Sequence, residues 1–381
     1  MKDKSLNTKT LAIVGASYLQ LPLVERAKEL GLRTICFAWE DGAVCKDECD
    51  KFCPISIVEK EQILEVCKTE RIDGICTIAS DVAAPTVAYV AEQMGLTGNS
   101  YECAVRANNK FLMRDAFLHA GIPSPKYICV TSEIQWNANE IVKELGLPLI
   151  VKPSDRSGSL GVIKVDHPEQ LQAAIQNALE CSFRHEAIVE QYIEGREISV
   201  EFISYQGKHF PLQITDKVTT GAPHFVELEH HQPANLDERK YAEIYDLTKR
   251  ALDALGVTNS ASHSEYRITE DGRIYVMEIG ARMGGDFIGS DLVQLSTGYD
   301  FLRGVIDVAL REFNEPKLNE HHCSGVYFLC KETAHLKQII EQHTIPQIVA
   351  FNIIDDELHP VTCSADRSGY LIYQSNHRIF I

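Results

Sequence analysis

The first hundred residues alternate between short apolar runs and longer amphipathic stretches, and this alternation constrains the fold more than any other feature of the chain. Apolar runs at 10–14, 33–37 and 74–78 are typical of buried strands, and the stretches at 21–30 and 82–94 are typical of helices. Strands that alternate with helices pair in parallel, because each helix carries the chain back to the start of the next strand. The sequence therefore predicts a Rossmann-like parallel α/β sheet for this region.

The loop after the first of these strands matches dinucleotide binding poorly. Gly15 stands in it, but the pattern GxGxxG is missing, and no acidic residue suited to a ribose follows the second strand. Strand ends on one edge of a parallel sheet are the usual place for a ligand. We therefore expect Ser80 and Asp81, at the end of a strand, to hold a small substrate rather than NAD.

Charge and composition limit the partners of the chain. Its 54 acidic and 37 basic side chains give a net charge of −17, which disfavours binding to nucleic acid or to an anionic membrane. The chain has no long uninterrupted apolar run and no apolar core of a signal peptide near its start, so we expect a cytoplasmic protein. Cys45, Cys49 and Cys53 lack the Cys-x-x-Cys spacing of zinc sites, and a metal role for them is the less favoured alternative.

A hairpin in the second half of the chain is the strongest candidate for its chemistry. Asp271-Gly272 lies between two short β-forming runs, which predicts a two-residue turn with Glu270 opposite Arg273. The same ladder places Glu265 directly opposite Glu278. Two opposed carboxylates repel each other and therefore favour a cation between them, and oxygen ligands suit Mg²⁺. The alternative is a surface hairpin with two solvated glutamates.

Basic residues beside small, flexible loops supply what a phosphate needs. The predicted strand at 149–153 carries Lys152 and leads into a Ser/Gly-rich loop at 154–162, whose backbone N–H groups can fold over anionic oxygens. Arg282 follows the hairpin and precedes Gly284-Gly285, so it can meet a phosphate beside the metal. The loop lacks the pattern of a P-loop, and an ordinary hairpin loop is the alternative.

The remaining elements follow from periodicity and from glycine and proline signals. The sequence predicts helices at 110–119, 137–145, 236–255 and from Gly298 to about Glu312, strands within 187–202, and a β-rich segment from about 320. The residues from Phe225 to Pro233 are polar and rich in histidine, and we expect a loop there.

Taken in order, these motifs resemble the ATP-grasp superfamily from Leu11 to about Glu312. The motifs are Asn109-Lys110, Ile150-Val151-Lys152-Pro153 with its Ser/Gly loop, the run from Val189 to Glu197, and then Glu265, Glu278 and Arg282. Each motif is weak alone, and their order makes the set specific. The run from Gly280 to Asp286 and the tail from Ser364 to Tyr370 look most like the bacterial L-amino-acid ligases and related carboxylate–amine ligases.

The resemblance implies an α/β and α+β architecture. A Rossmann-like pre-ATP-grasp domain would precede a two-lobed ATP-grasp fold and a small β-rich C-terminal segment. The implied divisions are 1–105 for the substrate domain, 106–188 for the small lobe, 189–315 for the large lobe with the Mg-ATP site, and 316–381 for a segment packed on the large lobe.

The resemblance also implies roles for individual residues. Lys110 and Lys152 would neutralise phosphate oxygens, and the loop with Ser157, Gly158, Ser159 and Gly161 would close over the phosphates. The implied roles of the others are adenine contact through the backbone for Glu190 and Ile193, ribose binding for Glu197, metal binding for Glu265 and Glu278, transition-state stabilisation for Arg282, and a phosphate or substrate contact for Lys217.

One position departs from the family pattern. Many members carry asparagine two residues after the second metal glutamate, as a further metal ligand, and this chain has Gly280 there. The number of bound metal ions is therefore open. A base that takes a proton from the amine is also open, with His263, His230, His231 and Glu229 as candidates.

The resemblance implies an ATP- and Mg²⁺-dependent ligase, with Mn²⁺ as an alternative metal. It would activate a carboxylate as an acyl phosphate and transfer it to an amine, both small molecules or the amine on a carrier protein. The substrate pocket is expected near Ser80-Asp81, residues 216–233 and Gly285-Asp286. The alternatives are a bicarbonate-activating carboxylase or a carbamoyl-phosphate-synthase-like enzyme, and a non-catalytic nucleotide-binding module. A homodimer is the default expectation for a chain of this kind.

Overall fold

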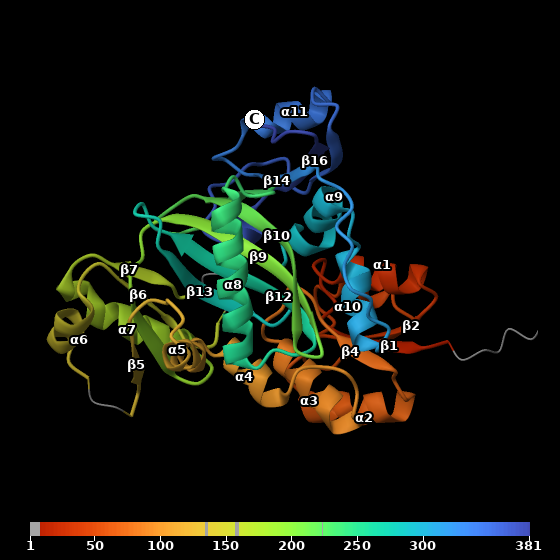
Figure 1. Cartoon of the computed structure of the whole chain (residues 1–381), viewed down its shortest axis with the longest axis horizontal. Helices are drawn as coiled ribbons and strands as arrows, with labels where there is room; N and C mark the ends of the chain where they lie inside the picture. The colour runs from red at the N-terminus through yellow and green to blue at the C-terminus, as the bar shows by residue number, and fades with distance from the viewer. Residues whose placement is uncertain (1–7, 134–135, 157–159, 223) are drawn as a thin grey trace, which may run out of the picture.

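The computed structural model of the chain describes residues 8–133, 136–156, 160–222 and 224–381. The strands of these residues form three sheets, and helices cover their faces (Figure 1). No helix in the described ranges is long and apolar enough to cross a membrane. The exact division of the chain into four segments stays a prediction.

The first sheet is parallel, as the alternation of apolar and amphipathic runs predicts. Its strand order is β3-β2-β1-β4, with β1 paired to both β2 and β4. The strands are β1 (Thr10–Val14), β2 (Arg33–Phe37), β3 (Lys51–Cys53) and β4 (Gly74–Cys76). The helices that accompany them are α1 (Leu21–Glu29), α2 (Lys60–Glu70), α3 (Ala84–Met94) and α4 (Tyr101–Asn108). After β4 the chain stays extended, and Ile78 forms a parallel bridge with Met283.

The second sheet is antiparallel and has the order β5-β8-β6-β7. Its strands are β5 (Tyr127–Thr131), β6 (Leu149–Pro153), β7 (Ile163–Val165) and β8 (Glu186–Gln191). The helices of this part are α5 (Lys110–His119), α6 (Ala138–Leu145) and α7 (Leu171–Cys181). Figure 1 shows this unit at the left of the molecule. Side chains from α6, α7 and the sheet share one apolar cluster.

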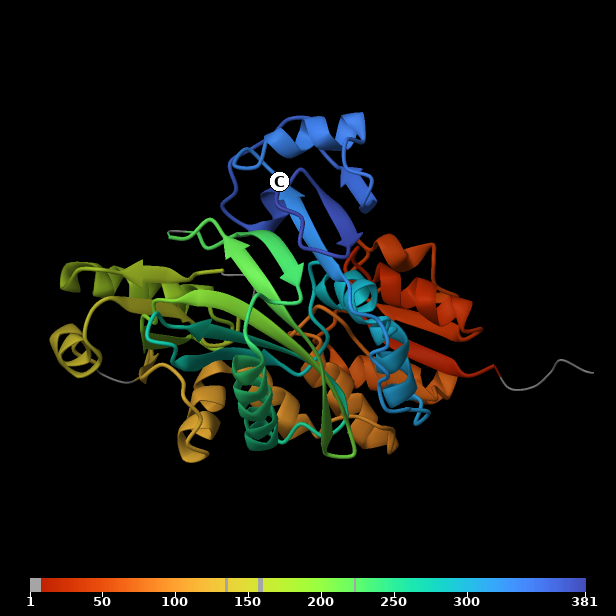
Figure 2. The same cartoon turned by 45° about the horizontal axis from the view of Figure 1, so that its top comes forward.

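The third sheet has eight strands in the order β13-β12-β9-β10-β11-β14-β16-β15. The strands are β9 (Arg196–Tyr205), β10 (Lys208–Thr219), β11 (Glu227–Gln232), β12 (Ser260–Ile268), β13 (Ile274–Gly280), β14 (Cys323–Leu329), β15 (Ile348–Ile353) and β16 (Gly369–Ser375). The strands of the C-terminal segment therefore extend the same sheet, and Figure 2 shows them rising from its end beside β11. The helices of this part are α8 (Glu238–Leu255), α9 (Val293–Thr297), α10 (Phe301–Ala309) and α11 (His335–Gln342).

The prediction of a loop from Phe225 to Pro233 is wrong. Residues Glu227–Gln232 form β11, which pairs with β10 on one side and β14 on the other. The six residues are almost all polar, so they show no apolar alternation, yet His230 and His231 are buried. The polar side chains meet charged partners inside the protein instead of water, and a periodicity argument cannot detect such a strand.

The hairpin between β12 and β13 confirms that Glu265 lies opposite Glu278, but the strand register that brings them together differs from the predicted one. Thr269 pairs with Arg273, so the loop has three residues and not two, and the ladder is shifted by one position. A β-bulge between Glu265 and Tyr266 leaves Met277 as an extra residue and restores Glu265 opposite Glu278. The predicted pairs between the turn and the bulge are therefore wrong, because Asp-Gly also suits the three-residue loop with glycine at positive φ.

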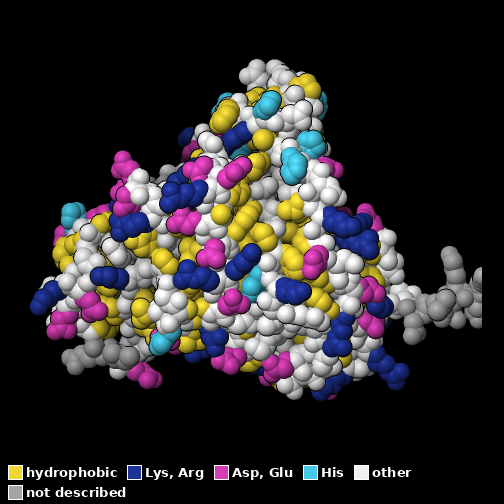
Figure 3. Space-filling view, in the orientation of Figure 1, with side chains coloured by type: hydrophobic (Ala, Val, Ile, Leu, Met, Phe, Trp, Pro, Cys, Tyr) yellow, Lys and Arg dark blue, Asp and Glu magenta, His cyan; other side chains and the backbone are white. Residues whose placement is uncertain are grey.

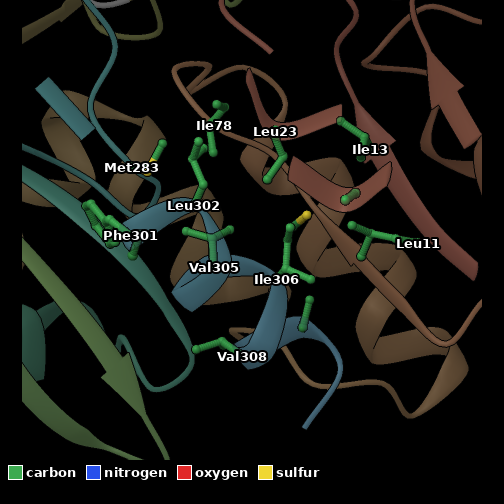
Figure 4. Close-up of a cluster of buried hydrophobic side chains, with 14 of the residues drawn as sticks. Leu11, Ile13, Leu23, Ile78, Met283, Phe301, Leu302, Val305, Ile306 and Val308 are labelled. Carbon is green, nitrogen blue, oxygen red and sulfur yellow. The ribbon is translucent and has the colours of Figure 1, made fainter. Parts of the chain in front are cut away.

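Helix α10 joins the first sheet to the third. Phe301, Val305 and Ile306 pack with Leu11 and Ile13 of β1 in one buried cluster (Figure 4). The same cluster contains Ile203 of β9 and Ala261 of β12 among its other members. Because the apolar face of one helix serves both sheets, the end of β4 is held against the residues that follow β13.

The outer face of the molecule mixes charges of both signs. Figure 3 shows Lys and Arg side chains interspersed with Asp and Glu side chains across the face viewed in Figure 1. The described residues of this face therefore mix both signs of charge and form no extended basic field.

Candidate active site

A cleft of about 460 Å³ lies where the three sheets meet. Its walls come from segments far apart in the sequence, and its charged lining includes Asp81, Lys110, Lys152, Glu190, Glu197, Lys217, Glu265, Glu278, Arg282 and Asp286. Every described residue that the sequence singles out for phosphate or metal binding, except Gly161, therefore lines one cavity.

The two opposed glutamates each face a lysine. Lys217 Nζ lies 2.5 Å from Glu265, and Lys110 Nζ lies 2.9 Å from Glu278. Burial opposes the charge of Glu265, but Lys217 and His263 hold the pKa of this carboxyl well below its usual value. Burial also opposes the charge of Lys110, and the Glu278 carboxylate outweighs it, so the pKa of Lys110 is raised. Glu265 and Lys110 are therefore charged at neutral pH.

Lys152 and Glu190 form a buried charge network with Arg114. Glu190 lies in β8, before the connector to β9, and its side chain is 1% exposed. Its carboxylate lies 2.7 Å from Lys152 Nζ and 2.7 Å from Arg114 Nε. Burial lowers the pKa of Lys152, even though Glu190 acts in the opposite direction. The Glu190 side chain thus positions the lysine, and its backbone lies within the sheet, in register with Tyr127 of β5 on one side and Ile150 of β6 on the other.

The connector and the start of β9 carry the other predicted nucleotide contacts. The Ile193 carbonyl accepts a hydrogen bond of 2.7 Å from Arg267, and the Arg267 guanidinium also pairs with Glu197. The same guanidinium lies 5.2 Å from the centre of the Tyr192 ring and 5.7 Å from that of Phe225. All of these groups line the cleft, and two of them are aromatic. Arg267 was not predicted from the sequence.

The structure describes the Ser/Gly loop at residues 154–156 and 160–162. Ser157, Gly158 and Ser159 lie outside the described residues. Gly161 has φ +73°, and a Cβ on it would lie 3.0 Å from Pro153, so glycine is required there.

Arg282 is held by the first sheet. Its guanidinium pairs with the Asp81 carboxylate, and Ala79 donates a backbone hydrogen bond of 3.0 Å to Met283. Arg282 Nε is buried and has no hydrogen-bond partner among the described residues. A Cβ added to Gly280 would overlap Asp81 Oδ1 and lie 3.1 Å from Arg282 Cζ. The departure at Gly280 is therefore explained by packing, because the Asp81 carboxylate takes that space.

The four candidate bases differ in their surroundings. His263 pairs through Nδ1 with the buried Glu201 carboxylate; burial opposes its charge, but Glu201 and Glu265 raise the pKa of His263 to about 9. His230 also lines the cleft, and burial lowers its pKa. His231 and Glu229 pair with each other at 2.8 Å and do not line the cleft. His263 is thus a cation at neutral pH, and His230 is neutral.

Several residues of the site carry little sequence signal. Glu201 lies on the same polar face of β9 as Glu197, and this polar face is a sequence signal that could have indicated it. The Glu201 carboxylate accepts a hydrogen bond from the backbone N–H of Gly284. Arg114 stands alone in its segment, and no local pattern separates it from surface arginines, whereas Arg367 lies in the run from Ser364 to Tyr370 that resembles the amino-acid ligases.

The donor set of the cleft fits a nucleotide bound through a divalent cation. The facing carboxylates of Glu265 and Glu278 supply hard oxygen ligands, and Lys110, Lys152 and the unpartnered Arg282 Nε supply positive donors for phosphate oxygens.

The chain is similar to known proteins in sequence and in fold. Residues 145–291 match the family model of the ATP-grasp domain. Alanine–anticapsin ligase of Bacillus subtilis (strain 168) is 31% identical over 247 residues, which cover 59% of this chain and 51% of that protein. The structure of an L-amino acid ligase from Bacillus licheniformis has a TM-score of 0.79 at 23% identity and covers 98% of this chain and 95% of that one. An N5-carboxyaminoimidazole synthetase from Staphylococcus aureus, solved with ADP, has a TM-score of 0.79 at 15% identity, with 98% and 95% covered.

The match to the ATP-grasp domain covers residues 145–291, and the chain as a whole has the fold of the L-amino acid ligase structure. In sequence it is similar to amino-acid ligases, and it spans about half the length of the curated relatives named first among its matches. The two superpositions lie below 25% identity and establish the fold alone.

Proposed function

We propose that this chain is an ATP- and Mg²⁺-dependent ligase that joins a small-molecule carboxylate to an amine. The observation that carries the proposal is the pairing of Glu265 with Glu278 across the hairpin, inside a cleft that also holds Lys110, Lys152 and Arg282. The similarity to alanine–anticapsin ligase over the central part of the chain supports an amino acid as one substrate.

Glu265 and Glu278 would hold Mg²⁺, or Mn²⁺ in its place, and Lys217 and Lys110 would then exchange their carboxylate partners for anionic oxygens. The metal, when bound, neutralises phosphate charge. Lys152 would bind phosphate oxygens. The remaining nucleotide contacts would come from the backbone of Glu190 and Ile193, from Glu197 at the ribose, and from the loop with Ser157, Gly158, Ser159 and Gly161.

The protein contributes position and charge to the reaction. The substrate carboxylate is already ionised at neutral pH, so its oxygen can attack the γ-phosphorus without a base, and ADP leaves as the acyl phosphate forms. The amine nitrogen then attacks the acyl carbon, phosphate leaves, and the nitrogen loses a proton. Arg282, held by Asp81, would stabilise the negative charge on the transferred phosphoryl group in both steps.

Phosphate release from ATP tests the proposal. We expect release with Mg²⁺ and selected pairs of amino acids, and we expect hydroxylamine to trap the acyl phosphate as a hydroxamate when no amine is added. Carrier-bound amines belong in the same panel. Release with bicarbonate alone, and with none of the amino acids, would overturn the ligase assignment in favour of a bicarbonate-activating enzyme.

A pair of variants in the same hairpin tests the site. Glu278→Ala is expected to lower ATP turnover by at least about a hundredfold, because Lys110 loses its partner and the metal loses a ligand. Glu270→Ala removes an exposed glutamate from the tip of the hairpin and is expected to retain turnover. Equal turnover in the two variants would mean that the metal site lies elsewhere.

A further inference from the structure

A second group of charged side chains lies beside the metal glutamates, and the proposed reaction does not use it. It consists of Glu227 and His230 of β11, Asp286 after β13, and Arg367 just before β16. Lys217 connects it to the metal site, because its ammonium lies 2.5 Å from Glu265 and 3.4 Å from Glu227.

The two carboxylates of this group face the cleft, and the arginine lies behind them. Glu227 and Asp286 line the cleft with side chains 23% and 25% exposed, whereas the Arg367 side chain is 6% exposed and does not line it. Arg367 reaches Asp286 at 2.9 Å and Glu227 at 3.1 Å, and its guanidinium lies 3.8 Å from the centre of the Phe328 ring. The cation thus fixes the carboxylates from the protein side.

The loop that carries Asp286 is held under backbone strain. Asp286 and Phe287 both have positive φ, +51° and +65°, which costs about 1 kcal/mol for each residue without glycine. The Arg367 ion pair and the contact of the Phe287 ring with Tyr370, 4.2 Å between centres, retain the loop in this form. The C-terminal segment therefore aims the Asp286 carboxylate into the cleft.

His230 gives independent evidence for a ligand at this place. Its side chain is 1% exposed, and its buried Nδ1 has no hydrogen-bond partner within the described residues. Nε2 lies 3.9 Å from Asp286, which is beyond hydrogen-bond distance. A buried polar ring that lines a cleft without a partner is costly unless a bound group or water satisfies it.

The charge of the group selects the ligand. Two carboxylates share one guanidinium, His230 is neutral because burial lowers its pKa, and the closer partner of Lys217 is Glu265. The face that the group turns to the cleft therefore consists of two carboxylates, with the Arg367 guanidinium on the protein side. It would repel the carboxylate substrate and the phosphates, so the substrate that it faces is the amine.

We propose that Glu227 and Asp286, held by Arg367, form a subsite for a positively charged nitrogen on the amine substrate, in addition to the nitrogen that reacts. The inference rests on the proposed ligase function. It specifies the acceptor as an amine with a second cationic group, such as a basic amino acid or a diamine.

Paired amines of matched size test the subsite. With a carboxylate that gives the hydroxamate, kcat/KM is measured for L-lysine against L-norleucine, which lacks only the second ammonium group. We expect the wild type to favour lysine at least about tenfold, the effect of one charge-assisted hydrogen bond. Asp286→Asn should bring this ratio close to one. Asp356→Asn, at a side chain 90% exposed in the C-terminal segment, is the control and should keep the ratio.

The outcomes separate this inference from the proposed function. Hydroxamate formation without a preference for lysine, or a preference that Asp286→Asn leaves unchanged, overturns the subsite and leaves the ligase standing. Absence of hydroxamate with every carboxylate overturns the ligase itself. If Asp286→Asn does not fold, Glu227→Gln is measured in the same way and its ratio decides.

Discussion

At the scale of single residues, the Asp81 side chain occupies the space next to Gly280 that a side chain at position 280 would need. The Asp81 carboxylate belongs to the first sheet, and it also holds Arg282, which would act on the phosphoryl group. A change at either position therefore acts on the arginine.

Gly280→Ala is expected to lower ATP turnover at least about tenfold and to destabilise the fold by about 1–3 kcal/mol, because the added methyl group displaces Asp81 from Arg282. Asp81→Gly removes the overlap, so the double variant should be more stable than the sum of the single effects by about 1 kcal/mol. Urea unfolding of the four proteins measures this coupling. Strictly additive effects would contradict the overlap.

Glu190 is a second single residue on which the site depends, because its carboxylate neutralises two buried cations. Glu190→Gln should destabilise the protein by about 3–5 kcal/mol, since Arg114 and Lys152 lose their shared partner. Burial opposes the charge of Glu190, but Arg114 and Lys152 outweigh it and lower the pKa of this carboxyl.

The lowered pKa fixes the sign of a pH effect. A carboxyl with a lower pKa in the folded state stabilises the protein above the unfolded pKa, about 4.3, and this contribution is lost as the pH falls through the folded value. The difference in unfolding free energy between wild type and Glu190→Gln should therefore be constant from neutral pH down to about 5 and shrink below about 4. Urea titrations at several pH values measure it, and an equal difference at pH 3 and pH 7 would contradict the role given to Glu190.

At the scale of elements, the β12–β13 hairpin reaches its functional register through two irregularities. The three-residue loop shifts the ladder by one position, and the bulge at Met277 shifts it back before the glutamates. Glu265 and Glu278 therefore lie beyond the bulge, and the loop can be altered without changing their pairing.

Gly272→Ala tests this separation. Gly272 has φ +81°, and an added Cβ would meet only Lys240 Nζ at 3.9 Å, so the cost is conformational and amounts to about 1 kcal/mol. The urea midpoint should fall accordingly while ATP turnover is retained. A large loss of turnover would show that the loop, and not the bulge, determines the position of Glu278.

At the scale of the whole molecule, α10 couples the first sheet to the third and so places Asp81 beside Arg282. Ile306 is fully buried in the cluster that the two sheets share. Ile306→Ala should cost about 2–5 kcal/mol, whereas Arg303→Ala on the exposed side of the same helix should stay within about 0.5 kcal/mol. Circular dichroism during urea unfolding measures both. Equal effects of the two substitutions would mean that α10 does not carry the shared core.

Local interactions explain what could be predicted from the sequence. Strands at 10–14, 33–37 and 149–153, the hairpin and the opposition of Glu265 to Glu278 depend on neighbours along the chain, and periodicity and turn residues report them directly. Lys110 lies at the predicted helix start and Lys152 in the predicted strand at 149–153, and both positions agree with the structure. β11 was missed because its burial depends on polar partners from other strands.

The amino-acid sequence by itself determined which charged groups the chain carries and which short segments present them. Only the tertiary structure decided that Asp81 would hold Arg282, that Glu201 would hold His263, and that Arg367 would aim Asp286 into the cleft. These partners lie between 62 and 201 residues apart. Such contacts form only when packed sheets bring distant segments together, because no local preference of the backbone records a partner that far along the chain.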